Sequence, residues 1–230
     1  MPGVPRYLNR MSDIIGAAVV VVTPFQQNAT LLWCKATMRG AWVDPGGDLP
    51  TLRQAARAKG VIVERVWLTH GHIDHAGEAG IFAAELGVPI EGPHIEDKFW
   101  LDSLEEVGRG YGMDAARAFT PDRWFDEGDT VTVGEVSFNV RHTPGHTPGH
   151  VIFHQPQVGL AQVGDVLFQG SIGRTDFPRG NHAALIASVR DKLWPLGDAT
   201  RFIPGHGAMS TFGTERRSNP HVSDAALSQP

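Results

Sequence analysis

Short apolar runs alternate along the chain with polar segments that are rich in glycine and proline. Runs of this kind, bounded by turn-forming residues, are typical of β-strands. They predict strands over residues 14–23, 29–36, 41–43, 61–68, 88–90, 131–133, 136–140, 151–154, 160–163 and 201–203. Apolar positions three or four residues apart predict helices over residues 52–59, 76–86, 96–106 and 183–193. The order of these elements indicates an α/β protein with two sheets flanked by helices.

The two ends of the chain lack this periodicity. We therefore expect a flexible N-terminus over residues 1–13, a single domain over residues 14–220 and a tail over residues 221–230, with little order after Ser218. The chain has 230 residues, of which 41% are hydrophobic, so it is long enough for one substantial core.

Charge and cysteine content narrow the classes of partner. The formal net charge of −5 gives no general attraction to nucleic acid or to anionic membranes. The longest apolar segment, residues 14–22, is far shorter than the ~20 residues that span a bilayer. The single cysteine, Cys34, lies in an apolar run and is expected to be a packed thiol, which fits a reducing compartment. These features predict a cytoplasmic protein, and without a long exposed apolar helix face we expect a monomer.

A dense cluster of metal-binding groups follows the strand predicted over residues 61–68. The sequence Thr69-His70-Gly71-His72-Ile73-Asp74-His75 places three imidazoles and one carboxylate within six residues. Ordinary packing does not require such a density, whereas metal coordination does. The cluster lies between a predicted strand and a predicted helix, where α/β sheets position ligands. A metal site is therefore the first functional hypothesis.

Three later loops each follow a predicted strand and offer one further ligand: His146, Asp165 and His206. Together with the first cluster they supply five imidazoles and two carboxylates, enough for two metal ions. His70 and His72 are two residues apart and point the same way from an extended loop, so we expect this pair and the pair Asp74–His75 to serve different metals.

Asp165 and Asp44 have further predicted roles at this site. A carboxylate can bind two cations at once, which makes Asp165 the natural bridge. Asp44, in the turn that follows the strand predicted over residues 41–43, is a candidate to hydrogen-bond a metal-bound histidine; the alternative is a simple turn-forming role.

The motifs T-H-G-H-I-D-H, T-P-G-H-T-P-G-H, G-D-V-L-F and P-G-H-G occur in this order and resemble those of the metallo-β-lactamase superfamily. Residues 170–180 and 215–220 resemble the short, single-domain type II glyoxalases, or hydroxyacylglutathione hydrolases. The resemblance implies an αββα four-layer sandwich. It also implies one metal on His70, His72 and His146, a second on Asp74, His75 and His206, and Asp165 between them. Only about a dozen residues follow Arg217, so we expect no C-terminal helical domain of the kind with which long glyoxalases II hold glutathione.

The resemblance implies a binuclear metallohydrolase that cleaves a small thioester such as S-D-lactoylglutathione by means of a metal-bridging hydroxide. The expected cofactors are two divalent ions, zinc first, with iron or manganese as alternatives. Asp74 and Asp165 are the catalytic candidates, because either carboxylate can orient the hydroxide. Arg174 is the substrate-binding candidate, and its alternative role is a salt bridge with Asp176.

Other functions remain open at this point. A persulfide dioxygenase with one ferrous ion on His70, His146 and Asp165 has a related segment on the same fold. Hydrolysis of another ester, lactone or thioester is a second alternative. A non-catalytic metal module is disfavoured, because seven ligand candidates exceed what a structural site needs. His142, His150 and His154 are expected to pack around the ligands rather than to bind metal.

Overall fold

The first β-sheet comes from the N-terminal part of the chain. The computed structural model describes residues 14–228. This sheet has the order β1 (Ile15–Val22), β2 (Gln27–Cys34), β3 (Arg39–Val43), β4 (Ile62–Trp67) and β5 (Ile90–Glu91). Strands β1 to β3 pair antiparallel, and β3 to β5 pair parallel. Parallel neighbours need a crossover connection, which the helices α2 (Leu49–Lys59) and α4 (Ala79–Leu86) provide.

The second sheet comes from the C-terminal part. Its order is β13 (Ser210–Thr211), β12 (Arg201–Pro204), β9 (Leu160–Gly164), β8 (Val151–Gln155), β7 (Val136–His142) and β6 (Thr130–Val133). Strands β9 and β12 are parallel, and the other neighbours are antiparallel. A separate hairpin joins β10 (Leu167–Phe168) to β11 (Ser171–Ile172). The sequence did not predict this hairpin, because strands of two residues carry no measurable periodicity.

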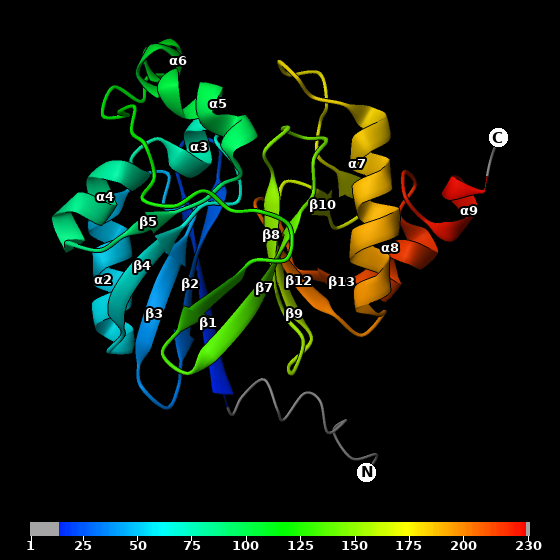
Figure 1. The fold of residues 1–230 in the computed structure, drawn as a ribbon, viewed down its shortest axis with the longest axis horizontal. Coiled ribbons are helices and arrows are strands. Elements are labelled where there is room, and N and C mark those ends of the chain that lie inside the picture. The colour runs from blue at the N-terminus through cyan, green and yellow to red at the C-terminus, as the bar shows by residue number, and fades with distance from the viewer. Residues whose placement is uncertain (1–13, 229–230) are drawn as a thin grey trace.

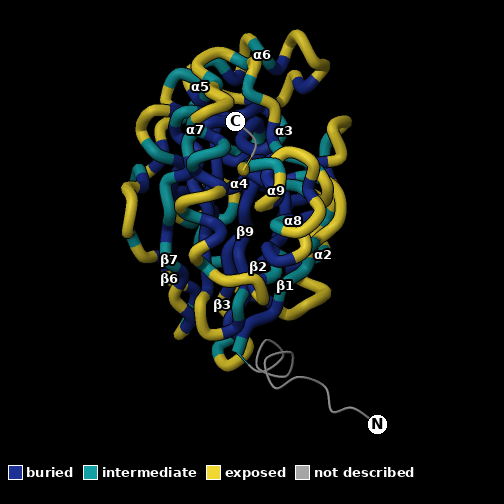
Figure 2. Tube along the Cα trace, turned by 90° about the vertical axis from the view of Figure 1, so that its right-hand side faces the viewer, coloured by how far each residue is buried: buried dark blue, intermediate teal, exposed yellow. Residues whose placement is uncertain are grey.

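The two sheets pack face to face and helices cover both outer faces, which gives four layers (Figure 1). Alternation along β2 explains the arrangement: Leu31 and Trp33 join the core beneath the helices of the first sheet, whereas Leu32 and Cys34 join the core between the sheets. The strands form the buried centre of the molecule (Figure 2). The predicted αββα sandwich is confirmed.

Aromatic packing joins the sheets. The ring of Trp67 on β4 lies 5.6 Å from that of Phe138 on β7 and 5.3 Å from that of Phe153 on β8, measured between centroids. Cys34 is buried and free, in agreement with the predicted packed thiol. These contacts hold the ends of β4 and β8 together, next to the loops that carry the ligand candidates.

The helices differ in detail from the predicted ranges. The helix expected over residues 76–86 starts earlier and is interrupted. Residues Ile73–Ala76 form the short helix α3, and α4 follows after a break of two residues. Asp74 and His75 therefore already belong to a helical turn. The helix expected over residues 96–106 is divided into a 3₁₀ turn (Ile95–Asp97), α5 (Lys98–Asp102) and α6 (Leu104–Tyr111). Ser103 separates α5 from α6, because its hydroxyl donates to the carbonyl of Trp100 and competes with helix continuation.

The C-terminal segment is more ordered than the sequence predicted. Helix α7 (His182–Ser188) continues into a π-helical turn (Val189–Leu193) and a 3₁₀ turn (Trp194–Leu196) and covers the second sheet with α8 (Phe212–Ser218). Beyond Ser218, where little order was expected, the chain forms α9 (Asp224–Leu227). Val222 is fully buried in the core under these helices, and Arg216 binds Asp224, which explains the order.

The flexible N-terminus predicted over residues 1–13 lies outside the described residues. Among the helices of residues 14–228, none combines the length and the apolar character that crossing a bilayer requires.

Candidate metal centre

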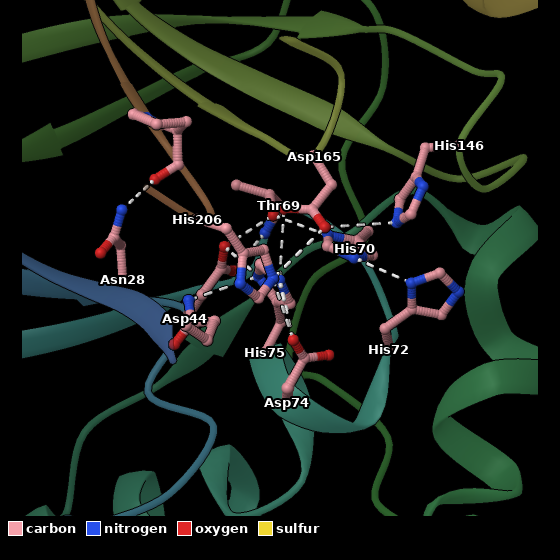
Figure 3. Close-up of polar contacts among 12 residues, drawn as sticks. Asn28, Asp44, Thr69, His70, His72, Asp74, His75, His146, Asp165 and His206 are labelled. Carbon is pink, nitrogen blue, oxygen red and sulfur yellow. Dashed lines mark hydrogen bonds and ion pairs between the residues drawn. The ribbon is translucent and has the colours of Figure 1, made fainter. Parts of the chain in front are cut away.

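The seven predicted ligand candidates come together between the two sheets (Figure 3). Three of their loops follow strands β4, β9 and β12, and the fourth joins β7 to β8. The residues brought together are His70, His72, Asp74, His75, His146, Asp165 and His206. Residues that lie far apart in the sequence, from His70 to His206, therefore share one site.

The first group contains His70, His72 and His146. Their nearest ligand atoms lie within 4.8 Å of one another, and all three side chains are buried. His70 Nε2 lies 3.1 Å from His72 Nδ1, so these imidazoles face each other across a short gap. A single cation could be held by all three.

The second group contains Asp74, His75 and His206. Asp74 Oδ2 lies 3.1 Å from His206 Nε2 and 3.6 Å from His75 Nε2. Their mixed oxygen and nitrogen donors suit a divalent cation such as zinc, iron or manganese. Asp74 and His75 lie in the helical turn α3 that follows the loop of His70 and His72. The rings of His70 and His75 still lie only 4.1 Å apart between centroids, so the two predicted pairs are adjacent in space.

Asp165 faces both groups. Its Oδ1 lies 3.4 Å from His75 Nε2, and its Oδ2 lies 3.6 Å from His146 Nε2 and 3.5 Å from His206 Nε2. One carboxylate is thus within reach of both groups, which is the arrangement that a bridging ligand requires.

Several inward-facing polar atoms of this site lack a hydrogen-bond partner among the described residues. The atoms are His75 Nε2, His146 Nε2 and Asp165 Oδ1. A buried polar atom without a partner costs roughly 1–3 kcal/mol, so three of them in one place point to a site that binds a ligand. Divalent cations coordinate these donor types, and the residues therefore fit a pair of metal ions.

In four of these histidines, the second ring nitrogen contacts an oxygen atom that does not belong to the ligand candidates. His70 Nδ1 lies 3.0 Å from the hydroxyl of Thr69, and His75 Nδ1 lies 3.0 Å from Asp44 Oδ2. His146 Nδ1 lies 2.8 Å from the carbonyl oxygen of Arg174, and His206 Nδ1 lies 3.2 Å from that of Phe25. Metal-binding histidines are usually oriented in this way, with one nitrogen bound to an acceptor and the other directed to the metal.

The electrostatics of the two groups differ. Burial, reinforced by the neighbouring imidazoles, lowers the pKa of His70 well below its ordinary value, so this ring is neutral and can donate its lone pair. Burial alone would also lower the pKa of His75, but the surrounding carboxylates, Asp165 foremost, raise it to about 10. Burial would raise the pKa of Asp74, but His75 and His206 hold it well below its usual range. The second group therefore attracts positive charge strongly.

Asp44 anchors the histidine loop, as its place in the turn after β3 suggested. Its side chain is fully buried and accepts hydrogen bonds from the backbone and the hydroxyl of Thr69, in addition to its contact with His75. The structure thus favours the supporting role over the simple turn-forming one.

His150 packs behind the ligands, in agreement with the prediction for this residue. Its ring stacks on that of His70 at 4.9 Å, and its Nε2 accepts a hydrogen bond from the backbone N–H of Asp165. His142 donates to the carbonyl of Pro148, and His154 is buried on β8. His142 belongs to a separate group with His94 and Glu96, whose ligand atoms lie within 4.8 Å of one another. Among the described residues, His150 and His154 belong to no such group.

Sequence reasoning missed Asp97. This fully buried carboxylate accepts hydrogen bonds from Gly71 N at 2.9 Å, Thr147 Oγ1 at 2.7 Å and Gly149 N at 2.6 Å. It therefore ties the loop of His70 and His72 to the loop of His146. Burial raises its pKa to about 6. In the sequence, an aspartate at the start of a predicted helix looks like an ordinary capping residue.

Arg174 lies at the side of a cavity that opens over the ligand candidates. Its guanidinium makes two hydrogen bonds of 2.6 Å to the carboxylate of Asp176 and lies 4.2 Å above the ring of Phe177. This is the salt bridge that the sequence offered as the alternative role. To bind a substrate carboxylate, the guanidinium would have to exchange partners.

Comparisons with known proteins agree with this geometry. Residues 22–206 match the family described as the Metallo-beta-lactamase superfamily. The chain is 44% identical over 205 residues to hydroxyacylglutathione hydrolase GloC of Haemophilus influenzae, covering 89% of this chain and 96% of that protein. Two crystal structures are also similar in fold and sequence. BLEG-1, a B3 metallo-β-lactamase, has a TM-score of 0.83 and 32% identity, with 90% of this chain and 99% of that chain covered. A di-iron-bound form of TTHA1623 has a TM-score of 0.81 and 34% identity, with 89% of this chain and 100% of that chain covered.

A family match over most of the chain, the four-layer fold and the clustered histidines and aspartates all lead to one assignment. This chain belongs to the metallo-β-lactamase superfamily.

Proposed function

We propose that this protein is a binuclear metallohydrolase that cleaves a small thioester such as S-D-lactoylglutathione. The observation that supports this most is that Asp165 lies within 3.6 Å of imidazoles from both ligand groups, at a site with unpartnered buried donor atoms. The similarity to GloC supports the thioester as substrate. The chain would correspond to a short, single-domain type II glyoxalase.

The proposed division of ligands follows the two groups. His70, His72 and His146 would hold one ion, Asp74, His75 and His206 the other, and Asp165 would bind both. Zinc is the first candidate, although donors of this kind also accept iron or manganese. When bound, a pair of divalent ions would lower the pKa of water to about 7 and so supply hydroxide at neutral pH.

The residues of the chain would position the reacting groups. The carboxylates of Asp74 and Asp165 face the middle of the site, where either could accept a hydrogen bond from the attacking hydroxide and fix its direction. A thiolate is a good leaving group, so the reaction places little demand on a general acid. Arg174, which is exposed at the side of the cavity, would attract an anionic part of the substrate after releasing Asp176.

The alternatives differ in how many of these ligands they need. A mononuclear persulfide dioxygenase would use His70, His146 and Asp165 and would leave the group of Asp74, His75 and His206 without a function. Hydrolysis of another ester or a lactone would use the same centre with a different cavity occupant. The proposal of a thioesterase uses all seven ligand candidates and the similarity to GloC.

Replacement of single ligands tests the proposal. His72→Ala and Asp165→Ala should each lower the metal content and the rate of S-D-lactoylglutathione hydrolysis together. His182→Ala is the matched control, because His182 is an exposed histidine at the start of α7. Full hydrolysis by either ligand variant with reduced metal content would refute the assignment.

A further inference from the structure

The cavity over the candidate metal centre is larger than the proposed substrate's acyl group requires. Its volume is about 560 Å³. A lactoyl group occupies on the order of 100 Å³, the share of a few water molecules in the liquid. Most of the cavity is therefore available to another part of the substrate or to a larger acyl group.

Apolar side chains from separate segments line most of this space. Phe25 comes from the β1–β2 turn, Trp100 from α5, Val107 and Tyr111 from α6, and Phe177 from the loop before α7. Such cavities bind ligands by apolar contact and orient them with a few polar groups.

The aromatic walls support one another. The rings of Phe25 and Tyr111 meet edge to face with centroids 5.3 Å apart. Phe177 lies 5.0 Å from the ring of His72 and 6.1 Å from that of Trp100. These ring contacts hold the aromatic side chains in place and so define the shape of the apolar surface.

Apart from the metal centre, the cavity offers one cationic side chain, and that side chain already has a partner. Arg174 is the one lysine or arginine among the described residues that line it, and its guanidinium is bound to Asp176. Charged groups are poorly accommodated on an apolar surface unless they find a partner. The carboxylates and the ammonium group of glutathione would find few partners on these walls.

We infer that the cavity binds an apolar group of aromatic size that is attached to the thioester of the substrate. This inference rests on the proposed thioesterase function and specifies its substrate class. The apolar group can belong to the acyl part, which extends from the thioester carbon, or to the thiol part, which is attached through the sulfur.

Binding of non-hydrolysable thioethers to the metal-loaded protein tests the inference by calorimetry. One series keeps glutathione and enlarges the group that replaces the acyl part from methyl through propyl to benzyl. The other keeps an S-methyl group and enlarges the thiol part from ethyl mercaptan through butyl mercaptan to benzyl mercaptan. We expect one series to bind about fourfold more tightly for each added methylene equivalent until the cavity is filled. The series that shows this trend identifies the source of the apolar group. Affinities that stay constant or fall with size in both series would overturn the inference.

A variant that fills the cavity provides a second measurement. Val107→Phe should weaken binding of the benzyl ligand at least tenfold and leave the S-methyl ligand unchanged, a size dependence that misfolding would not produce. The matched control is Ile62→Phe, because Ile62 is a 60% exposed apolar residue on β4 and does not line the cavity. Equal binding of the benzyl ligand by both variants would contradict the inference.

Hydrolysis measured on the same preparations separates this inference from the proposed function. Size-dependent binding without hydrolysis of any thioester would refute the proposed function and leave only the affinity of the cavity for apolar groups. Thioester hydrolysis without size-dependent binding would refute only the inference about the cavity.

Discussion

Asp44 Oδ2 lies 3.0 Å from His75 Nδ1, and neither side chain is exposed to solvent. The other contacts of Asp44, to the backbone N–H of Thr69 at 2.7 Å and to its hydroxyl at 2.6 Å, hold the start of the histidine loop. One carboxylate from the turn after β3 thus fixes both the loop and the orientation of a ligand candidate on it. The buried negative charge also favours a cation next to His75.

Asp44→Asn should lower the affinity for divalent metal by on the order of 10–100-fold, the usual effect of removing such a supporting acceptor. Asparagine keeps the shape and tolerates the positive φ of 53° at this position, so the fold should survive. Competition with a chelator measures the affinity. Asp48→Asn is the matched control, because Asp48 has a φ of 55° but is exposed and contacts Thr23 instead. Unchanged affinity in Asp44→Asn would contradict the supporting role.

Asp97→Ala should both destabilise the protein and loosen the metal centre. It leaves the donors of Gly71, Thr147 and Gly149 without their acceptor, at roughly 1–3 kcal/mol for each buried donor that finds no water. We therefore expect the free energy of unfolding to fall by about 3 kcal/mol or more in urea, with a parallel loss of metal affinity. Asp97→Asn should recover part of both.

The control for Asp97 is Asp102→Ala, which removes an exposed ion pair with Lys98 on the same helical segment. Exposed pairs contribute about 0–1 kcal/mol, so this variant should resemble the parent protein. If Asp97→Ala were no less stable than Asp102→Ala, the link between the two loops would have no energetic importance.

Gly205→Ala should prevent assembly of the metal centre. A Cβ at this position would lie 2.0 Å from Asp165 Oδ1 and 2.6 Å from His75 Cε1, so the proposed bridging carboxylate would have to move. We expect the purified variant to retain less than a tenth of the parent's metal. Gly110→Ala serves as the control, because a Cβ there meets no atom within 4 Å and alanine favours the helix by about 1 kcal/mol. Normal metal content in Gly205→Ala would show that the loop of Gly205 can move to accommodate the methyl group, and would contradict the prediction.

The Arg174–Asp176 pair should be insensitive to pH over the range in which enzymes are usually assayed. A hydrogen bond from Arg174 lowers the pKa of Asp176 from 3.8 to about 2. Because the folded pKa is below the ordinary one, the interaction is fully present above about pH 4 and is lost as the pH falls through 2. An NMR titration of the carboxyl carbon should show this midpoint, and Arg174→Gln should return it toward 3.8. Arg190→Gln should leave Asp176 unchanged, since Arg190 pairs with Asp191; an Arg174→Gln titration like that of the parent would refute the pairing.

The sequence predicted the strands better than the helices. Leu31 and Leu32 lie on opposite faces of β2, and both faces are buried. A continuous apolar run is typical of such a strand, so the sequence alone predicts it. The break between α5 and α6 depends on the hydroxyl of Ser103 finding the carbonyl of Trp100, which no periodicity encodes. Order after Ser218 depends on Val222 entering a core made by distant elements.

The ligand candidates were predictable because metal-binding side chains are rare and gather in loops after strands. His70, His146 and His206 each carry this signal in a local motif. Asp97 carries none, because its importance comes from three donors on two loops that only the tertiary structure brings to it. The cavity is similarly invisible in the sequence: Phe25 and Tyr111 look like ordinary core residues until the fold places their rings together.

The most direct test of the central claim is hydrolysis of S-D-lactoylglutathione by metal-free protein to which zinc, iron or manganese is returned in known amounts, with oxygen uptake recorded alongside. We predict that thioester loss rises with metal up to about two ions per chain and consumes no oxygen. The account would be contradicted if the protein did not hydrolyse the thioester but consumed oxygen with glutathione persulfide, at a rate that is maximal with one iron per chain.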